Sequence, residues 1–166
     1  NDGFAYQVSA LKTSGKLRLE LSNTLYQDTY NPSYLGYLDQ NNRIINFGRV
    51  EYISYDRSKH TKFRRLSFFF TNELLYKPTR YSRNEFTISG GMTFHNEFHF
   101  DLETSVTPGV KYDYFEPRQL GYKYAEPRAI WAGFNFNTDT RKRLSISRML
   151  IGYWIAEKYN KSAFYL

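Results

Sequence analysis

The residues of this chain best placed to do chemistry lie at alternate positions of one short stretch. His99, Asp101 and Glu103 are separated by apolar residues, and side chains two apart on a β-strand point the same way, about 6.6–6.8 Å apart along it. We expect Glu85, on a neighbouring strand, to lie across from them. Such spacing suits paired carboxylates in hydrolysis, or a metal site.

The rest of the sequence does not extend this group into a recognisable active site. It contains no Ser–His–Asp order, glycine-rich phosphate loop or metal-ligand spacing, and these motifs depend on fixed offsets. Charged residues on one strand face are also what the wet interior of a membrane barrel contains. We therefore expect no catalytic residue, no metal and no cofactor, and keep a barrel-embedded hydrolase as an alternative.

Two similar tripeptides lie near the middle of the chain, Glu116-Pro117-Arg118 and Glu126-Pro127-Arg128. Each can present a carboxylate and a guanidinium to a ligand. Each can also tie down its loop through a Glu–Arg pair, which contributes about 0–1 kcal/mol when exposed. We favour the second interpretation, in which proline stiffens the loop and the charges hold it.

Two loops rich in aromatic residues are the remaining site candidates, because loops carry function more often than strands do. Their tyrosines can stack on sugar rings or fold into the mouth of a barrel as a plug. The predicted ligand-binding residues of the loops are Tyr34, Tyr37, Tyr112, Tyr114, Glu116, Arg118, Glu126 and Arg128.

The element that positions the charged group is a hairpin from Glu85 to Val106. Apolar residues or glycine occupy most even positions and polar residues most odd positions, so the hairpin has one apolar and one charged face. In a soluble protein the apolar face points to the core, whereas in a transmembrane barrel it points to lipid. The residues predicted to line such a barrel's interior are Arg18, Glu20, Glu85, His99, Asp101 and Glu103.

Composition excludes several classes of protein. The chain has 166 residues, a net charge of +7, no cysteine and 19% aromatic residues. Without cysteine it has neither a disulfide scaffold nor a thiolate metal site. No apolar run approaches the roughly 20 residues that a spanning helix needs. Lys and Arg are spread along the chain rather than gathered as a nucleic-acid footprint, so we expect no nucleic-acid partner.

The alternation of residues predicts about eight strands, most of them long. A tilted membrane strand needs about 9–11 residues, more than a usual globular strand. The predicted strands are 3–11, 17–27, 43–55, 63–76, 85–94, 98–106, 128–137 and 144–155.

The predicted connections alternate between short turns and longer loops, as in an up-and-down transmembrane β-barrel. The short ones are 12–16, 57–62, 95–97 and 138–142, and the longer ones are 29–42, 77–83 and 107–127. Counting from the short turns places both chain ends at the long-loop rim, whereas complete outer-membrane barrels start and finish at the other one. We therefore expect residues 1–166 to form a single incomplete barrel domain, a segment of a larger barrel.

Two loop motifs resemble those of an uncharacterised Gram-negative family of outer-membrane barrels. Residues 30–38 (YNPSYLGYL), followed by Asn41-Asn42, resemble its "N-D-L-G-F-L-x-x-N-N" loop, and residues 112–118 (YDYFEPR) resemble its "D-Y-Y-E-P-R" loop. Tyr34 stands where an aspartate is common. Members of that family carry an N-terminal domain similar to family-9 carbohydrate-binding modules, which is not visible in this sequence, before a barrel of unknown function.

The resemblance implies a protein of the bacterial outer membrane, with a binding, transport or envelope-assembly role rather than catalysis. Its implied partners are outer-membrane lipid and lipopolysaccharide, other envelope proteins and surface glycans. A soluble antiparallel barrel with an apolar ligand inside is the alternative from a different class.

Overall fold

The computed structural model describes residues 3–30, 40–55, 58–115, 117, 121–156 and 162–165, and all regular structure in them is β. No helix in this part of the chain is long and apolar enough to cross a membrane. The strands are β1 (Ala5–Lys12), β2 (Leu17–Tyr26), β3 (Arg43–Ser54), β4 (Thr61–Leu75), β5 (Arg80–Phe94), β6 (His99–Thr107), β7 (Lys111–Asp113), β8 (Tyr124–Glu126), β9 (Arg128–Asn137), β10 (Ser147–Ala156) and β11 (Ser162–Tyr165).

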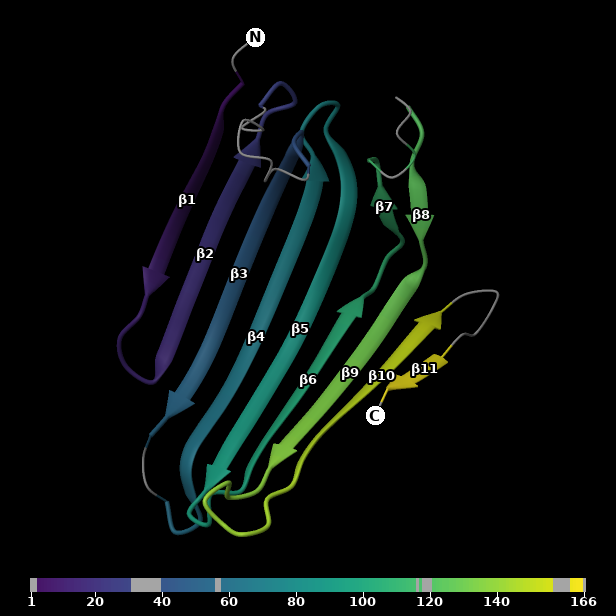
Figure 1. The fold of residues 1–166 in the computed structure, drawn as a ribbon. Helices are drawn as coiled ribbons and strands as arrows, with labels where there is room; N and C mark the ends of the chain where they lie inside the picture. The colour runs from purple at the N-terminus through teal and green to yellow at the C-terminus, as the bar shows by residue number, and fades with distance from the viewer. Residues whose placement is uncertain are drawn as a thin grey trace.

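Nine of these strands form one antiparallel sheet in the order β1-β2-β3-β4-β5-β6-β9-β10-β11. Each long strand lies beside its neighbours along the chain, and the small β7–β8 hairpin interrupts the series between β6 and β9 (Figure 1). The predicted all-β, antiparallel, up-and-down order is therefore confirmed. The sheet is open, with β1 and β11 at its two edges, so the described residues do not close into a barrel by themselves.

The eight predicted strands are all present, but two predicted loops differ from the structure: 107–127 contains the short strands β7 and β8, and 77–83 overlaps β5. Residues 77–83 were expected to form a loop, but β5 begins at Arg80, and only residues 76–79 link it to β4. Arg80 and Tyr81 pair with Leu75 and Leu74, beyond a register shift next to Glu73. Proline is confined to the turn, as its missing N–H requires, and an irregular ladder resumes after it. This link is therefore tight, and the expected alternation of short and long connections fails here.

The register gives the sheet two faces of opposite character. Residues of the apolar face pair only with one another across the ladder, as in the row Leu21–Gly48–Phe70–Phe86. We define the apolar face by Val8, Leu19, Leu21, Val50, Leu66, Phe68, Phe70, Phe86, Ile88, Leu102, Ile130, Phe134, Leu150 and Trp154. The polar face carries Arg18, Glu20, Arg49, Glu51, Arg65, Ser67, Glu73, Arg83, Glu85, Ser89, His99, Asp101, Glu103 and Ser105.

The two faces are buried in the reverse of the usual order for a water-soluble sheet. On the apolar face Leu21, Phe68 and Leu102 are 66%, 47% and 51% exposed. On the polar face Ser67, Ser89 and Ser105 are only 1%, 4% and 2% exposed. Three exposed apolar side chains of the polar face, Leu11, Met149 and Tyr153, lie on β1 and β10 toward the edges.

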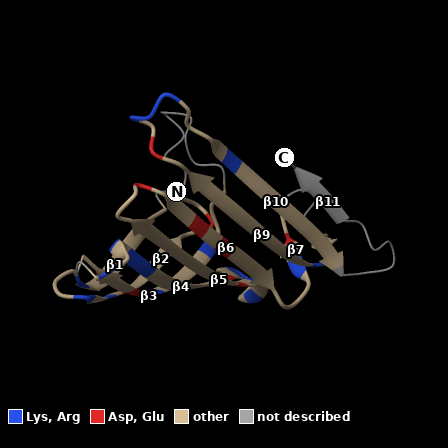
Figure 2. Ribbon diagram, turned by 90° about the horizontal axis from the view of Figure 1, so that it is seen from below, with Lys and Arg blue, Asp and Glu red and all other residues tan. Residues whose placement is uncertain are grey.

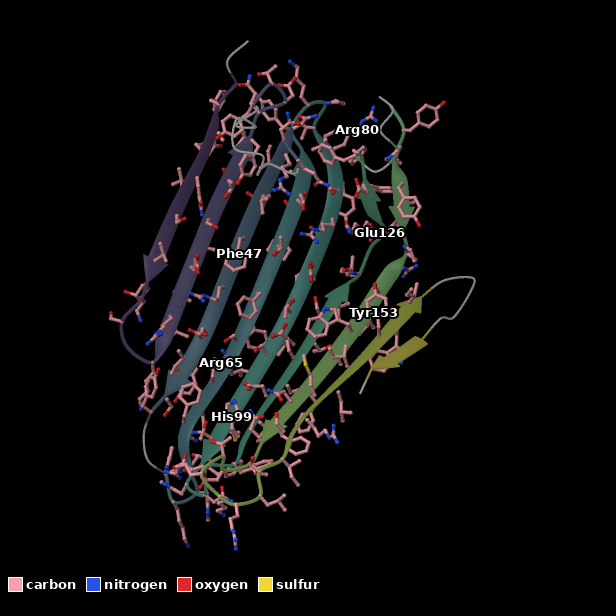
Figure 3. The ribbon with its side chains drawn as sticks, viewed as in Figure 1. Phe47, Arg65, Arg80, His99, Glu126 and Tyr153 are labelled. Carbon is pink, nitrogen blue, oxygen red and sulfur yellow. The ribbon has the colours of Figure 1, made fainter. Side chains whose placement is uncertain are left out.

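The sheet is curved, and its two faces differ in burial. Viewed from below, the strands do not lie in one plane, and acidic and basic residues mark the strands as well as the turns (Figure 2). Phe47, Arg65, His99 and Tyr153, labelled in Figure 3, come from four different strands and belong to the polar face. Short serine side chains between long charged ones let the polar face pack closely without an apolar core.

Candidate functional site

The side chains predicted to do chemistry form a connected chain of contacts on the polar face. His99 Nε2 lies 2.5 Å from Asp101 Oδ2, and its Nδ1 lies 2.8 Å from the Thr93 hydroxyl. Asp101 Oδ1 accepts a hydrogen bond from the Arg65 guanidinium at 3.3 Å. Three strands, β4, β5 and β6, thus supply a hydroxyl, an imidazole, a carboxylate and a guanidinium in sequence.

A glycine between Arg65 and Asp101 makes their contact possible. Gly91 is the β5 residue that pairs with both of them in the ladder. A Cβ built there would lie 2.2 Å from Asp101 Oδ1, so no other residue leaves room for the Asp101 carboxylate in this position. The glycine lets two side chains two strands apart reach each other over its backbone.

The order hydroxyl–imidazole–carboxylate is the order of a nucleophile, its base and an orienting acid. Sequence spacing did not reveal it, because Thr93 precedes His99 across the hairpin turn and the pairing Thr93↔His99 exists only in the ladder. Acyl transfer also needs donors aimed at the developing oxyanion. Arg65 donates to Asp101 and Ser89, so its guanidinium is engaged within the network, although its buried Nε has no hydrogen-bond partner among the described residues.

Glu85 was expected to lie across from His99, Asp101 and Glu103, but it does not. Its β5 neighbour Phe86 pairs with Val106, at the other end of β6. Its carboxylate accepts a hydrogen bond from Ser105 at 2.8 Å and lies 3.4 Å from Arg83. The register of the hairpin separates Glu85 from the other acids, so the four residues are not one site.

The remaining predicted interior residues share the polar face. Arg18 and Glu103 lie in one ladder row with Glu51, Ser67 and Ser89 between them. In the next row Glu20 forms an ion pair with Arg49 at 2.9 Å. Among the described residues, no group of three or more histidine, aspartate or glutamate side chains is arranged to hold a metal ion.

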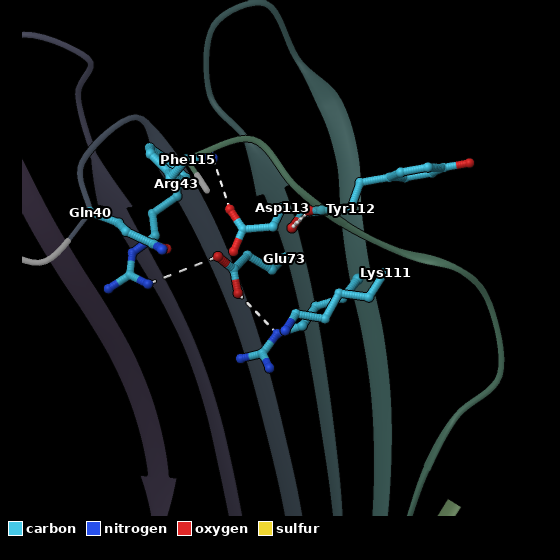
Figure 4. A pocket seen from close by; sticks show the side chains of 9 residues that line it. Gln40, Arg43, Glu73, Lys111, Tyr112, Asp113 and Phe115 are labelled. Atoms are coloured by element: carbon cyan, nitrogen blue, oxygen red, sulfur yellow. Dashed lines mark hydrogen bonds and ion pairs between the residues drawn. The ribbon is translucent and has the colours of Figure 1, made fainter. Parts of the chain in front are cut away.

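A small pocket lies where the long loop folds back over the polar face. It has a volume of about 140 Å³ and is lined by Gln40, Arg43, Glu73, Ser82, Arg83, Lys111, Tyr112, Asp113 and Phe115. Glu73 lies 3.9 Å from Arg43 and 3.0 Å from Arg83, and Figure 4 shows the Arg43 and Glu73 side chains facing each other. Glu73 is 8% exposed, and a carboxylate that is this buried requires such partners.

Residues 108–115, which include β7, supply the covering segment and pack on β5. The Ser82 hydroxyl donates to the Tyr112 carbonyl at 2.9 Å, and the Tyr114 hydroxyl donates to the Tyr81 carbonyl at 2.8 Å. The Tyr112 side chain points away from the pocket (Figure 4) and lies under Lys123 at 3.5 Å. Burial of Tyr114 raises the pKa of its hydroxyl above the ordinary value.

The predicted loop residues divide into three groups. Tyr34, Tyr37, Glu116 and Arg118 lie outside the described residues. Tyr112 and Tyr114 pack on the sheet, whereas Tyr122 and Tyr124, which the sequence did not single out, are 65% and 54% exposed. Glu126 pairs with Lys111 at 2.8 Å and Arg128 is exposed, so the expected Glu–Arg tie is a Glu–Lys tie made across the β7–β8 ladder.

A second rim pocket, with a volume of about 520 Å³, lies beside the first. Its lining includes Lys77, Arg80, Tyr114, Phe115 and Tyr122. This volume lies in the range of small-molecule sites, which span roughly 300–1,000 Å³. The lining also contains Asp28, which lies 3.8 Å from the Lys77 ammonium, so the pocket combines aromatic rings, an ion pair and the Arg80 guanidinium.

Two asparagines at this rim hold the loops in place. Asn41 Nδ2 donates to the carbonyls of Asp28 and Tyr30 at 2.8 and 3.1 Å. Asn42, at φ +55°, exchanges hydrogen bonds with the backbone of Lys77 at 2.9 and 2.8 Å. Asparagine tolerates this left-handed conformation and imitates a backbone partner, which gives the Asn-Asn pair of the motif a structural role.

The opposite end of the sheet, which we call the tight-turn rim, is held by ion pairs between side chains instead. Glu97 contacts Lys62 and Arg141, and Arg141 also contacts Asp139, so three turns are joined. Two hydrogen bonds from Arg141 lower the pKa of Asp139 to about 2. The hydrogen bond from Lys62 lowers the pKa of Glu97.

Comparison with known proteins adds one finding. No curated protein and no solved structure matches the chain. A family model described as a domain of unknown function (DUF5916) matches residues 1–166. The chain with this amphipathic sheet and these rim pockets therefore belongs to the DUF5916 family.

Proposed function

We propose that this chain is part of a transmembrane β-barrel in the bacterial outer membrane, with its apolar face toward lipid and its polar face toward a wet interior. The exposure of large apolar side chains on one face, opposite a closely packed polar face, carries the proposal. In water the exposed face would be an apolar patch far larger than soluble monomers tolerate.

Strand lengths support the same conclusion. β2, β3, β4, β5, β9 and β10 have between 10 and 15 residues, enough to cross a hydrocarbon layer at a tilt. A membrane does not tolerate lipid-exposed sheet edges, so the open edges of β1 and β11 require further strands as neighbours. The barrel we propose is therefore larger than the sheet described.

We further propose that the rim with the long loops faces the outside and carries a non-enzymatic binding or transport role. The pocket with Lys77, Arg80 and Tyr122 is the candidate site, and a surface glycan with an anionic group is the ligand class that fits it. The Thr93 hydroxyl and the Asp101 carboxylate both engage the His99 ring, which supports a structural role for these three residues.

The decisive experiment compares two adjacent positions on opposite faces of β6. The chain has no cysteine, so Leu102→Cys and Glu103→Cys each add one labelling site to this part of the complete barrel, reconstituted in lipid vesicles. The label at 102 should be quenched by a lipid-restricted nitroxide, and the label at 103 only by a water-soluble quencher. Shielding of position 102 from both quenchers would contradict the membrane proposal and favour the soluble barrel with an apolar ligand.

A further inference from the structure

The apolar face contains one polar row. Asn23, Asn46, Asn72 and Asn84 are ladder neighbours on β2, β3, β4 and β5. Their side-chain amides donate in one direction, from Asn23 to Asn46 at 2.7 Å, from Asn46 to Asn72 at 2.9 Å and from Asn72 to Asn84 at 2.8 Å. We call this row the asparagine ladder.

The ladder lies within the apolar face rather than at its border. Leu25, Ile44 and Leu74 form the row above it, and Leu21, Phe70 and Phe86 lie in the row below. Asn23, Asn46 and Asn72 are each three residues from the rim ends of their strands, which is about 10 Å at 3.3 Å per residue. On the proposed topology this depth is the outer leaflet just beneath the headgroups.

The ladder leaves hydrogen-bonding capacity unused. A primary amide has two N–H groups and two acceptor lone pairs, and each central asparagine uses one of each along the row. Asn46 and Asn72 are half-buried, so their amides reach the surface. Groups that meet only hydrocarbon would be costly there, and a lipid that brings its own donors and acceptors to this depth would satisfy them.

A hollow adjoins the ladder on the same face. It measures about 400 Å³, and Ala10, Gly48, Leu21 and Phe70 line it together with Asn23 and Asn46. Small Ala10 and Gly48 alternate with Leu21 and Phe70 along one row, which creates the depression. An acyl chain lying here would have its amide or hydroxyl end against the ladder.

Two cations lie beyond the ladder at the rim. Arg80 and Lys77, which has a 71% exposed side chain and lies 3.8 Å from Asp28, are at the link between β4 and β5, whose strands carry Asn72 and Asn84. Figure 3 shows Arg80 at this end of the sheet. From the long-loop end of the sheet toward its middle, the surface thus offers positive charge, amides and an apolar hollow.

We propose that the asparagine ladder and its hollow bind an anionic lipid whose acyl chains carry amide and hydroxyl groups next to the headgroup, the chemistry of the lipid A anchor of lipopolysaccharide. This inference rests on the membrane topology of the proposed function. Phospholipids with ester-linked chains offer the charge but not the N–H and O–H donors at that depth.

The test uses the complete barrel that contains this chain, in phosphatidylcholine nanodiscs with either lipid A or cardiolipin, both with two phosphates. Native mass spectrometry measures how much of each lipid the protein retains. The wild type should prefer lipid A. Replacing both central amides, as in Asn46→Leu with Asn72→Leu, should lower that preference about fivefold or more, since two or more hydrogen bonds are lost.

Three controls keep the outcomes separate. Asn135→Leu, on the polar face, should leave the preference unchanged, and Lys77→Gln should weaken both lipids equally. Asn46→Val, a residue suited to strands, replaces the double variant if that one does not fold. Equal retention of both lipids by the wild type, or an unchanged preference in the ladder variants, overturns the proposal. The proposal is also overturned if the ladder variants lose a protein dimer rather than bound lipid. Failure of the Leu102 label to meet lipid would instead contradict the membrane topology itself.

Discussion

The two faces of the sheet use opposite means to satisfy their side chains. On the polar face Arg65, Asp101 and His99 bond to one another across strands and serines fill the gaps, while the buried Nε atoms of Arg18, Arg49 and Arg65 have no hydrogen-bond partner in the described part of the chain. The apolar face leaves Leu21, Phe68 and Leu102 exposed, and the asparagine ladder is its one row of linked side-chain amides among the described residues. The polar face thus makes its contacts largely within the chain, whereas the apolar face depends on its surroundings.

The largest effect should come from a pair of identical residues on opposite faces. Phe68, exposed on the apolar face, and Phe69, less exposed on the polar face, are adjacent on β4. In lipid vesicles Phe68→Arg should lower the free energy of unfolding by about 2–4 kcal/mol, and by more than Phe69→Arg. Urea titration followed by tryptophan fluorescence measures both.

Burial in water predicts the reverse order, because Phe69 loses more packing than the exposed Phe68. A larger loss for Phe69→Arg in vesicles would therefore contradict the assignment of the apolar face to lipid.

A second pair tests how tightly the polar face is packed. Gly91→Ala places a methyl group 2.2 Å from Asp101 Oδ1, whereas Gly90→Ala on the apolar face meets its nearest atom at an ordinary 3.6 Å. We expect a loss of about 1–3 kcal/mol for Gly91→Ala, in line with overpacking, and little change for Gly90→Ala. Equal losses in the same urea titration would show that the Arg65–Asp101 contact does not constrain this face.

The cover over the polar face should depend on Tyr114. Tyr114→Phe removes the hydrogen bond to the Tyr81 carbonyl and should cost about 0.5–1.5 kcal/mol, seen as faster amide hydrogen exchange in residues 111–126. The exposed Tyr122→Phe serves as control. Because burial raises the pKa of Tyr114 above 10.0, its contribution should be present below pH 10 and lost as pH rises through the folded-state pKa.

The smallest effect should be found at the tight-turn rim, outside both faces. The pKa of Asp139 is lowered from 3.8 to about 2 by Arg141, so the contribution of this pair is present above pH 3.8 and lost as pH falls through 2. Carboxyl chemical shifts measured by NMR should follow that midpoint. Arg141→Ala should return it toward 3.8, and a midpoint that stays low in the variant would show another cause.

Periodic sequence features were predictable, and contacts across strands were not. The alternation along 85–106 predicted the hairpin, its faces and the shared face of Arg18, Glu20, His99, Asp101 and Glu103. Prolines 78, 117 and 127 marked loops, yet β5 extends back to Arg80 because a register shift restores pairing after the turn. The position of Glu85 relative to the other acids depended on the register between β5 and β6.

An antiparallel β meander with one charged and one apolar face follows from the amino-acid pattern alone, because side-chain alternation is a local property of a strand. The pairing of particular residues became visible in the folded sheet: Thr93 with His99, Glu126 with Lys111, and four asparagines in one row. Those contacts join residues 6 to 26 positions apart on different strands, and inter-strand register sets them through the turns and bulges between strands.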